Sequence, residues 1–245
     1  MDKQTLKKLL ESHPELSKIA QRYRHGGLLK RAFTESISGR DNNISIAPSS
    51  LLIRCAFEIE GNNNTITIAE GCFLKKASFR IKGDYNTIHI GSDIKIKNGG
   101  LIYAENDGCQ IKVGKATTFF KDIQIVAVEN DATIEIGEDC MFGSDNEIRT
   151  SDHHAILDLE SGERINPAKN VSIGNHVWVT NRVAILKGST IGNHCILGAK
   201  TVTSGPYRED HVILAGNPAR IVKRNITWDR SRIEAIDQAT VTNFE

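Results

Sequence analysis

The chain has 245 residues, of which 39% are hydrophobic, and its 31 Lys and Arg nearly balance its 30 Asp and Glu, leaving a formal charge of +1. This is globular composition, and so small a net charge gives no overall field for a polyanion, which excludes nucleic acid as the default partner. No run approaches the roughly 18 apolar residues of a transmembrane segment. The charged start MDKQTLKKLL lacks the apolar core of a signal peptide, so we expect a cytoplasmic protein. The five cysteines, without a C-x-x-C pair, favour neither a disulfide framework nor a zinc site.

The first two segments are a predicted cap and a repeat. Residues 1–38 carry apolar side chains at helical spacing, in L-K-K-L-L and I-A-Q-R-Y-R, and predict a short helical cap. Residues 39–148 repeat a unit seen in GRDNNISI, GNNNTITI and GDYNTIHI. The unit recurs every 22 or 23 residues and ends at Ile46, Ile68, Ile90, Val113 and Ile136. Its I-x-I part predicts a strand with both Ile on one face, and its Gly and Asn residues suit a turn.

The second half contains an interruption and a shorter period. Residues 149–170, RTSDHHAILDLESGERINPAKN, are polar and too long for a turn, so we expect a loop thrown outward from the coils. Residues 171–224 follow with a large apolar residue every six positions, at Ile173, Val179, Ile185, Ile191 and Leu197. A six-residue step predicts a triangular prism with 18 residues per coil. The final segment, 225–245, is polar and predicts a tail.

The longer period has two interpretations. The 22-residue unit is either the same triangular coil with about four extra turn residues or a differently shaped parallel β-helix. Cysteines follow an inward Ile by four residues in both halves of the chain, at Cys72, Cys140 and Cys195. We interpret them as small buried hydrophobic residues.

The run from 171 to 228 resembles the hexapeptide-repeat, left-handed β-helix acyltransferases, and most of all the O-acetyltransferases of capsule and surface polysaccharides. The segments IGNHVW (173–178) and AGNPAR (215–220) carry the match, together with the six-residue rhythm and the GNNNTITI units. The resemblance covers about residues 40–228. It implies an all-β, left-handed parallel β-helix, a homotrimer, and acetyl-CoA as co-substrate with no metal. The chain departs from the family at Thr180 and Lys200, where Gly is usual.

Acetyl transfer to a hydroxyl needs a base for the proton and a donor for the developing oxyanion. The family motif S-D-x-H-x-I reads S-D-H-H-A-I here (151–156), which implies His154 as the base and leaves His153 as a variable position beside the acceptor. Asp152 and Asp158 are both candidates to orient the imidazole, and the sequence does not choose between them. Trp178 is a candidate for contacts with acceptor and cofactor, with its backbone N–H as oxyanion donor. The alternative for Trp178 is burial against the loop or a neighbouring subunit.

Coenzyme A would place an apolar arm and several phosphates on the last coils. For the arm we expect the backbone near Gly198, Ala199 and Thr201, and for the phosphates the cations Lys187, Lys200, Arg220, Lys223 and Arg224.

The sequence thus predicts a cytoplasmic, trimeric O-acetyltransferase that moves acetyl directly from acetyl-CoA to a hydroxyl of a bacterial surface glycan or its precursor. No Ser or Cys is placed as a covalent relay. One alternative acceptor is a nucleotide sugar or small molecule, acetylated on nitrogen or oxygen. An alternative from a different class is a non-catalytic β-solenoid scaffold or glycan-binding protein. The S-D-H-H loop and AGNPAR argue against it, because a scaffold has no need of either.

Overall fold

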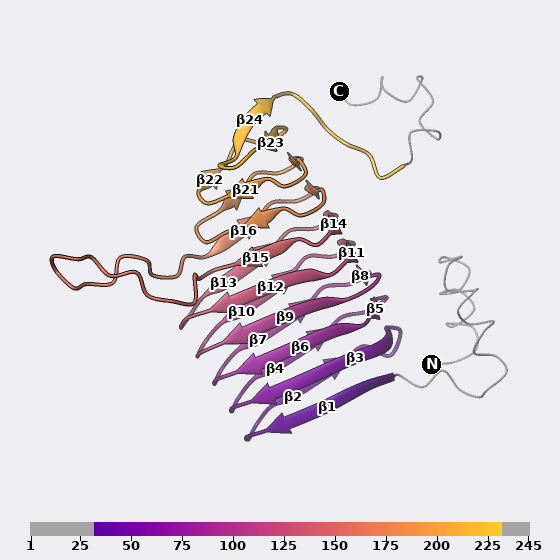
Figure 1. The fold of residues 1–245 in the computed structure, drawn as a ribbon. Helices are drawn as coiled ribbons and strands as arrows, with labels where there is room; N and C mark the ends of the chain where they lie inside the picture. Colours follow the sequence, from indigo (N-terminus) through magenta and orange to yellow (C-terminus); the bar gives the residue numbers. More distant parts are fainter. Residues whose placement is uncertain (1–31, 232–245) are drawn as a thin grey trace.

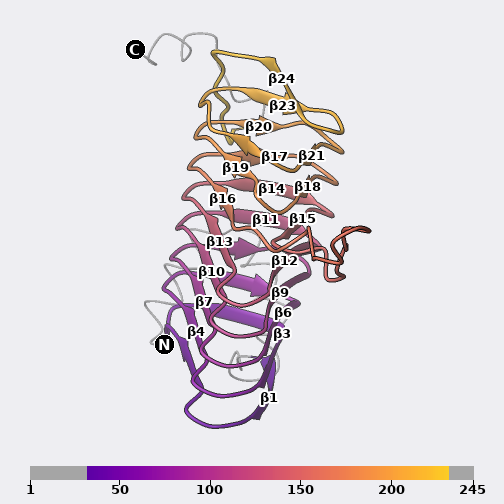
Figure 2. The ribbon, with the colours of Figure 1, turned by 90° about the vertical axis from the view of Figure 1, so that its left-hand side faces the viewer.

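A computed structural model describes residues 32–231, which wind into a parallel β-helix (Figure 1). Turned by 90°, the coils are seen stacked along one axis, each resting on the one before (Figure 2). Residues 32–231 contain strands, turns and loops but no helix, and so no helix there that could span a membrane.

Each coil has three faces, and each face is a ladder of strands. The first holds β2 (Asn43–Ile46), β4 (Thr65–Ile68), β7 (Thr87–Ile90), β10 (Gln110–Val113), β13 (Thr133–Ile136), β16 (Val171–Ile173), β19 (Thr190–Ile191) and β22 (Pro206–Tyr207). The second holds the start of β3 (Leu51–Glu60), then β5 (Phe73–Lys75), β8 (Lys95–Ile96), β11 (Thr118–Lys121), β14 (Met141–Ser144), β17 (Trp178–Val179), β20 (Ile196–Leu197), β23 (Ile213–Ala215) and β24 (Arg220–Lys223). The third holds β1 (Ala32–Ser38), the rest of β3, β6 (Ala77–Lys82), β9 (Gly100–Glu105), β12 (Ile123–Val128), β15 (Glu147–Arg149), β18 (Ala184–Ile185) and β21 (Val202–Thr203).

The strand register shows that the two halves are one continuous prism. The repeating residue occupies the same row throughout, through Ile46, Ile68, Ile90, Val113, Ile136, Ile173 and Ile191. One interpretation of the sequence placed the extra residues of the longer coil in a turn, and this is wrong. These residues lengthen the third face, where β6 has six residues and β18 has two. The sequence ASFRIK of β6 alternates apolar and polar residues, which is what a half-buried strand requires.

The beginning of the described chain differs from the predicted cap. Ala32–Ser38, the last part of the range 1–38, is strand β1 and pairs in parallel with β3. The exposed edge of β3 offers unpaired peptide groups, and pairing with them satisfies this segment's backbone better than a helical cap would. Residues 1–31, which carry the rest of the predicted cap, lie outside the described residues.

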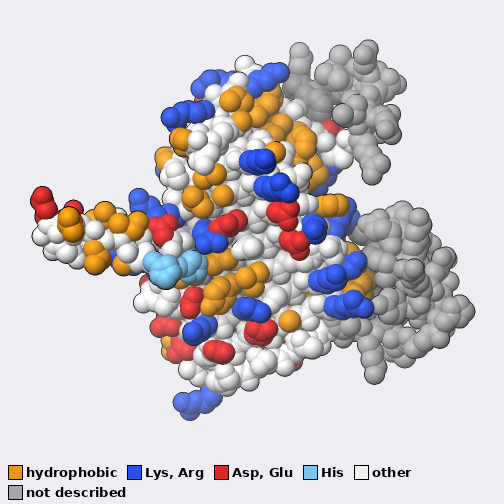
Figure 3. Space-filling model, viewed as in Figure 1, with side chains coloured by type: hydrophobic (Ala, Val, Ile, Leu, Met, Phe, Trp, Pro, Cys, Tyr) orange, Lys and Arg blue, Asp and Glu red, His pale blue; other side chains and the backbone are white. Residues whose placement is uncertain are grey.

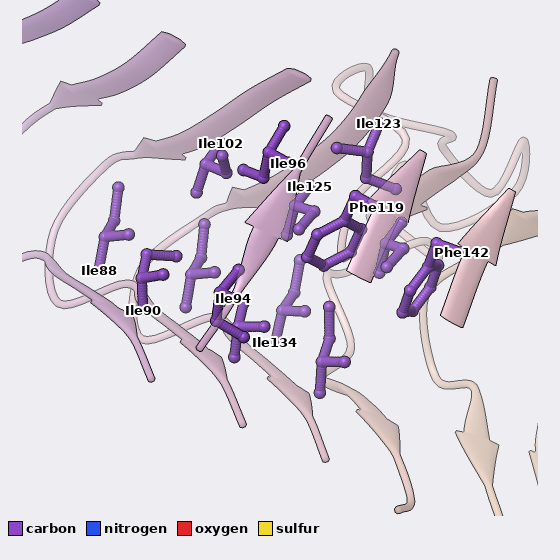
Figure 4. Packing of buried hydrophobic residues seen from close by; sticks show 14 of the residues in the cluster. Ile88, Ile90, Ile94, Ile96, Ile102, Phe119, Ile123, Ile125, Ile134 and Phe142 are labelled. Carbon is purple, nitrogen blue, oxygen red and sulfur yellow. The ribbon is translucent and has the colours of Figure 1, made fainter. Parts of the chain in front are cut away.

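The core is a column of inward side chains along the axis (Figure 4). Phe119 stacks on Phe142 of the next coil with ring centroids 4.8 Å apart. The five cysteines, Cys55, Cys72, Cys109, Cys140 and Cys195, are free and buried. Burial raises the pKa of the Cys72 and Cys140 thiols to about 11, so they stay protonated at neutral pH. The prediction that the cysteines are small buried residues is confirmed.

The end of the described chain folds back over the coils. Strand β24 pairs antiparallel with β23 rather than adding a further coil. Trp228 then donates from its indole Nε1 to the carbonyl of His176 at 2.7 Å, and Arg230 Nε donates to Asp139 Oδ1 at 2.7 Å. The described part of the predicted tail, up to residue 231, is therefore packed on the prism, and residues 232–245 lie outside the described residues.

Candidate active site

The interruption after β15 is a loop that projects from the prism, as the sequence predicts (Figure 1). It leaves at the corner between the third and first faces, in line with the Asn-rich turns of the earlier coils. Its outer part is a hairpin in which Leu157 bridges Arg164 in antiparallel register. The hairpin carries four exposed apolar side chains, Ile156, Leu157, Leu159 and Ile165, of which Leu159 is 99% exposed.

A carboxylate on the coil below fastens the base of the loop. Glu129, directly after β12, accepts two hydrogen bonds from the Arg164 guanidinium, at 2.6 and 2.8 Å. It also accepts from Ser151 Oγ at 2.6 Å and from the backbone N–H of Ala168 at 3.2 Å. The Arg164 hydrogen bonds, followed by those from Ser151 and Ala168, lower the pKa of Glu129 to about 2 against the opposing effect of burial. The two ends of the loop, at Ser151 and Ala168, are therefore both bound to one ionised side chain.

Asp152 is held by a second set of contacts. Its Oδ2 accepts from Lys187 Nζ, in the turn after β18, and from Asn166 Nδ2 at 2.8 Å. The Lys187 hydrogen bond, and after it that of Asn166, lowers the pKa of Asp152. Lys187 also donates to the carbonyl of Asn166 at 3.1 Å. The structure thus gives Lys187, expected among the phosphate-binding cations, an ion pair that fastens the loop.

The two loop histidines are exposed beside this network, and Figure 3 shows histidine side chains at the base of the projection, among acidic and basic neighbours. Within residues 32–231 the His154 imidazole makes no hydrogen bond or ion pair, so its ring nitrogens are open to a substrate. His153 has a positive φ of 63°, and its N–H donates to Ser151 Oγ at 3.1 Å. Asp158 shapes the turn of the hairpin, where its Oδ1 accepts from Ser161 N at 2.8 Å and Ser161 Oγ at 3.0 Å. Neither predicted orienting carboxylate bonds to His154 in the described chain.

An open pocket of about 470 Å³ lies at the foot of the loop. It is lined by Asn106, Glu129 and Asn130 from the turns of two coils, and by Pro167 and Ala168 from the returning end of the loop. Polar coil side chains and apolar loop groups thus share one hollow next to the anchored segment, a combination that suits part of a sugar.

Trp178 lies on another face of the same chain. It is part of β17 on the second face, whereas the loop leaves from the corner between the third and first faces. Its N–H donates to the Cys195 carbonyl at 2.9 Å, so the suggestion that this N–H is the oxyanion donor is wrong. The Trp178 ring is half-buried and lies 6.1 Å from the Trp228 ring.

The residues expected to contact coenzyme A divide into two groups. The N–H groups of Gly198, Lys200 and Thr201 already bond to carbonyls of neighbouring coils or the same turn, and the Thr201 side chain is fully buried, so these groups are not open for the pantetheine arm. Ala199 is exposed in that turn. Three exposed cations, Lys200, Arg220 and Lys223, make no ion pair within the described residues, and basic side chains gather at this end of the molecule (Figure 3). Arg224, by contrast, pairs with Glu209 at 2.8 Å.

A column of histidines stands at the corner between the first and second faces. His176, His194 and His211 occupy equivalent turns with positive φ, and the rings of His194 and His211 stack at 4.6 Å. His176 bonds through Nδ1 to Asp139 at 2.6 Å and through Nε2 to the Trp228 carbonyl at 2.9 Å. No group of three or more His, Cys, Asp or Glu in the described range is arranged to hold a metal ion.

Comparison with known proteins places this geometry in a family, although no family model matches the sequence. A polysialic acid O-acetyltransferase of Neisseria meningitidis is 36% identical over 151 residues, which is 61% of this chain and 69% of the relative. The crystal structure of the polysialic acid O-acetyltransferase OatWY superposes with a TM-score of 0.78 and 36% identity, over 87% of this chain and 99% of that one. The structure of the polySia-specific acetyltransferase NeuO gives a TM-score of 0.73 at 29% identity, over 86% and 96% of the two chains. The left-handed β-helix implied by the resemblance is confirmed, and the chain belongs to the hexapeptide-repeat O-acetyltransferase family that includes the polysialic acid O-acetyltransferases.

Proposed function

We propose that the protein transfers acetyl from acetyl-CoA to a hydroxyl group of a capsular polysaccharide, with His154 as general base. The observation that carries the proposal is the open imidazole of His154 on a loop whose backbone is fastened to two coils. The names of the similar proteins favour a sialic acid polymer as the first acceptor to test. Because acetyl-CoA is a cytoplasmic metabolite, we place the reaction in the cytoplasm.

The proposed step is a direct transfer. The imidazole of His154 accepts the proton of the sugar hydroxyl while that oxygen forms a bond to the thioester carbon. The carbon–sulfur bond of the tetrahedral intermediate then breaks, and the imidazolium returns the proton to the leaving thiolate. The products are an acetyl ester and free coenzyme A. The buried cysteines stay protonated, which supports transfer without a covalent enzyme intermediate.

Of the two candidate orienting carboxylates, Asp152 is the better supported. Its Oδ1 carries no hydrogen bond in the described chain, and it lies two residues from His154 in a segment that Asn166 fastens at both positions. The Lys187 ion pair keeps it ionised, as support of an imidazolium requires. Asp158 is committed to the turn of the hairpin.

The unpaired cations at the upper end of the prism suit the phosphates of coenzyme A. Lys200, Arg220 and Lys223 are exposed, and each lacks an acidic partner among residues 32–231. Replacing Arg220 and Lys223 together with Gln is expected to raise the KM for acetyl-CoA and leave kcat within about twofold, since phosphate contacts far from the thioester bind ground state and transition state alike. A fall in kcat at unchanged KM would contradict this placement.

A homotrimer would complete the site. In one chain His154 and Trp178 lie on different sides of the prism, and both need a neighbour if they are to meet one substrate. The apolar hairpin projects into solvent, and the second face presents an outward apolar row of Met141, Trp178, Ile196 and Ile213. Three copies related by rotation would cover both surfaces in closed symmetry. Light scattering measures the molar mass of the two proteins, and we expect three chains per particle for wild type and one for Leu159→Asp. A fully active monomeric wild type would contradict the proposed trimer.

The activity test is release of free thiol from acetyl-CoA in the presence of polysialic acid and a panel of other capsular polysaccharides. Thiol release that depends on the polysaccharide, with an acetyl ester on the recovered glycan, is the expected result. Activity confined to nucleotide sugars or small molecules would replace the acceptor class. Absence of transfer to any of these acceptors would contradict the proposed function.

A further inference from the structure

The Asn166 side chain takes part in four hydrogen bonds within the loop, although nothing in the S-D-H-H motif points to it. Its relative exposure is 7%, in a loop whose other residues between 152 and 170 are exposed or half-buried. A carboxamide has two N–H donors and one oxygen acceptor, and here all of these are used. A buried and fully satisfied amide of this kind specifies one geometry of the groups around it.

The carboxamide holds the backbone that directly follows the His154 side chain, on both sides of Ala155. Its Nδ2 donates to the carbonyl of His154 at 2.9 Å, and its Oδ1 accepts from the N–H of Ile156 at 2.7 Å. A carbonyl and the N–H two residues later are the pair of groups that a neighbouring β-strand would engage. The side chain therefore replaces a strand partner where the loop has none.

The same carboxamide links this segment to the rest of the site. Nδ2 also donates to Asp152 Oδ2 at 2.8 Å, and Oδ1 accepts from Arg164 Nε at 3.2 Å. The carbonyl of Asn166 accepts from Arg164 Nη2 at 3.0 Å and from Lys187 Nζ at 3.1 Å. Since Lys187 belongs to the turn after β18 and Arg164 is bound to Glu129 after β12, the amide is tied to two coils of the prism.

From these contacts we propose that Asn166 is the positioning residue of the reaction, fixing the place from which His154 takes the proton; this inference rests on the proposed acetyl transfer. The imidazole has no hydrogen bond of its own in the described chain, so its location follows from the backbone that Asn166 holds. Displacement of a reacting group by about 1 Å costs up to roughly a hundredfold in rate. The effect belongs in kcat, because Asn166 is not expected to touch acetyl-CoA.

The discriminating variant is Asn166→Asp, which keeps the size and the acceptor oxygen but replaces the doubly donating nitrogen with a charged oxygen. That oxygen would face the carbonyl of His154 and the carboxylate of Asp152, both acceptors. The matched control is Asn175→Asp in an exposed turn, where the side chain only accepts, from Glu138 N at 2.8 Å, and keeps that bond as a carboxylate.

We expect Asn166→Asp to lower kcat by about 10- to 100-fold, with the KM for acetyl-CoA within about twofold and the thermal unfolding of the prism unchanged. Asn175→Asp is expected to behave as wild type. A kcat within about threefold of wild type in Asn166→Asp, or a loss confined to KM, would overturn the proposal.

Hydrogen exchange of the Ile156 amide separates this inference from the proposed function, because the measurement needs no glycan substrate. Repulsion from the His154 carbonyl and the Asp152 carboxylate should move the new carboxylate of Asn166→Asp away from Ile156, so faster exchange than in Asn175→Asp is expected whether or not a glycan acceptor has been found. Equal exchange in the two variants would overturn the positioning role. A wild type that transfers no acetyl to any glycan, with exchange still faster in Asn166→Asp, would overturn the proposed function and retain Asn166 as the residue that orders the loop.

Discussion

The loop carrying His154 depends on the charge of Glu129, and removing that charge should loosen the loop while the prism stays intact. Glu129→Gln keeps the length of the side chain and one acceptor oxygen but abolishes the ion pair with Arg164. The carboxylate accepts four hydrogen bonds, two from Arg164 and one each from Ser151 and Ala168. The variant leaves the charge of Arg164 uncompensated at the base of the loop.

The magnitude follows from the pKa of Glu129, which lies at about 2 rather than 4.5. That difference corresponds to ~3 kcal/mol at 1.36 kcal/mol per pH unit. The two side chains are 25% and 37% exposed, and solvent screening reduces the contribution to ~1–2 kcal/mol. Because the folded-state pKa is the lower one, this stabilisation is fully present above about pH 4.5 and is lost as the pH falls toward 2.

The assay is hydrogen exchange at pH 7 of the amides of Ala168 and the segment 151–156. A loss of ~1–2 kcal/mol predicts exchange about 5–30 times faster in Glu129→Gln, with unchanged exchange in β12 and β15. The matched control is Glu138→Gln, whose pair with Lys115 at 3.2 Å is more than half exposed on both sides and should contribute little. Equal loop exchange in Glu129→Gln and wild type would refute the reasoning.

Three further predictions concern the prism. Asn64 is fully buried, donates to the Gly83 carbonyl and accepts from Asn86 N, both at 2.8 Å. Asn64→Ala should therefore lower the free energy of unfolding by about 2–4 kcal/mol in denaturant titration, and a loss under about 0.5 kcal/mol would contradict the stabilising role of these two hydrogen bonds. Phe142→Ala should cost about 3–5 kcal/mol by the same measurement, through loss of a buried ring and the cavity left behind, and an unchanged unfolding midpoint would argue against the packed core. Burial, and after it the charges of the neighbouring histidines, lowers the pKa of His194, so the unfolded chain takes up this proton first and stability should fall as the pH drops below about 6.5. His194→Asn should reduce that fall, and an identical pH dependence in variant and wild type would speak against the effect.

The sequence predicts the prism because each coil must place a large apolar residue at the same inward row. Large apolar residues therefore recur at a regular spacing, at Ile46, Ile68 and Ile90 and again at Ile173 and Ile191. The outward loop is predictable for the same reason, since the polar segment 149–170 lacks the regularly spaced inward apolar residues of a coil. The strand β1 is not predicted, because its pairing depends on the free edge of β3 rather than on local helical spacing.

The supporting contacts of the site are beyond this kind of reasoning. Glu129 and Arg164 are 35 residues apart, and their pairing depends on how the loop folds back onto the coil. Asn166 sits in R-I-N-P, a segment with no periodicity, and its role follows only from the groups that surround it. The sequence does not show that the backbone N–H of Trp178 is used, because its acceptor, the Cys195 carbonyl, lies on the coil that follows. A solenoid leaves few free N–H groups on its faces, which directs the search for oxyanion donors to loops and side chains.

The central claim is that His154 takes the proton of a glycan hydroxyl during acetyl transfer. The most direct measurement is NMR detection of O-acetyl groups on polysialic acid after incubation with acetyl-CoA and either wild type or His154→Ala. The account predicts acetyl ester formation by the wild type and a loss of at least about a hundredfold in the variant, as expected when a general base is removed. Equal acetylation by both proteins would contradict it.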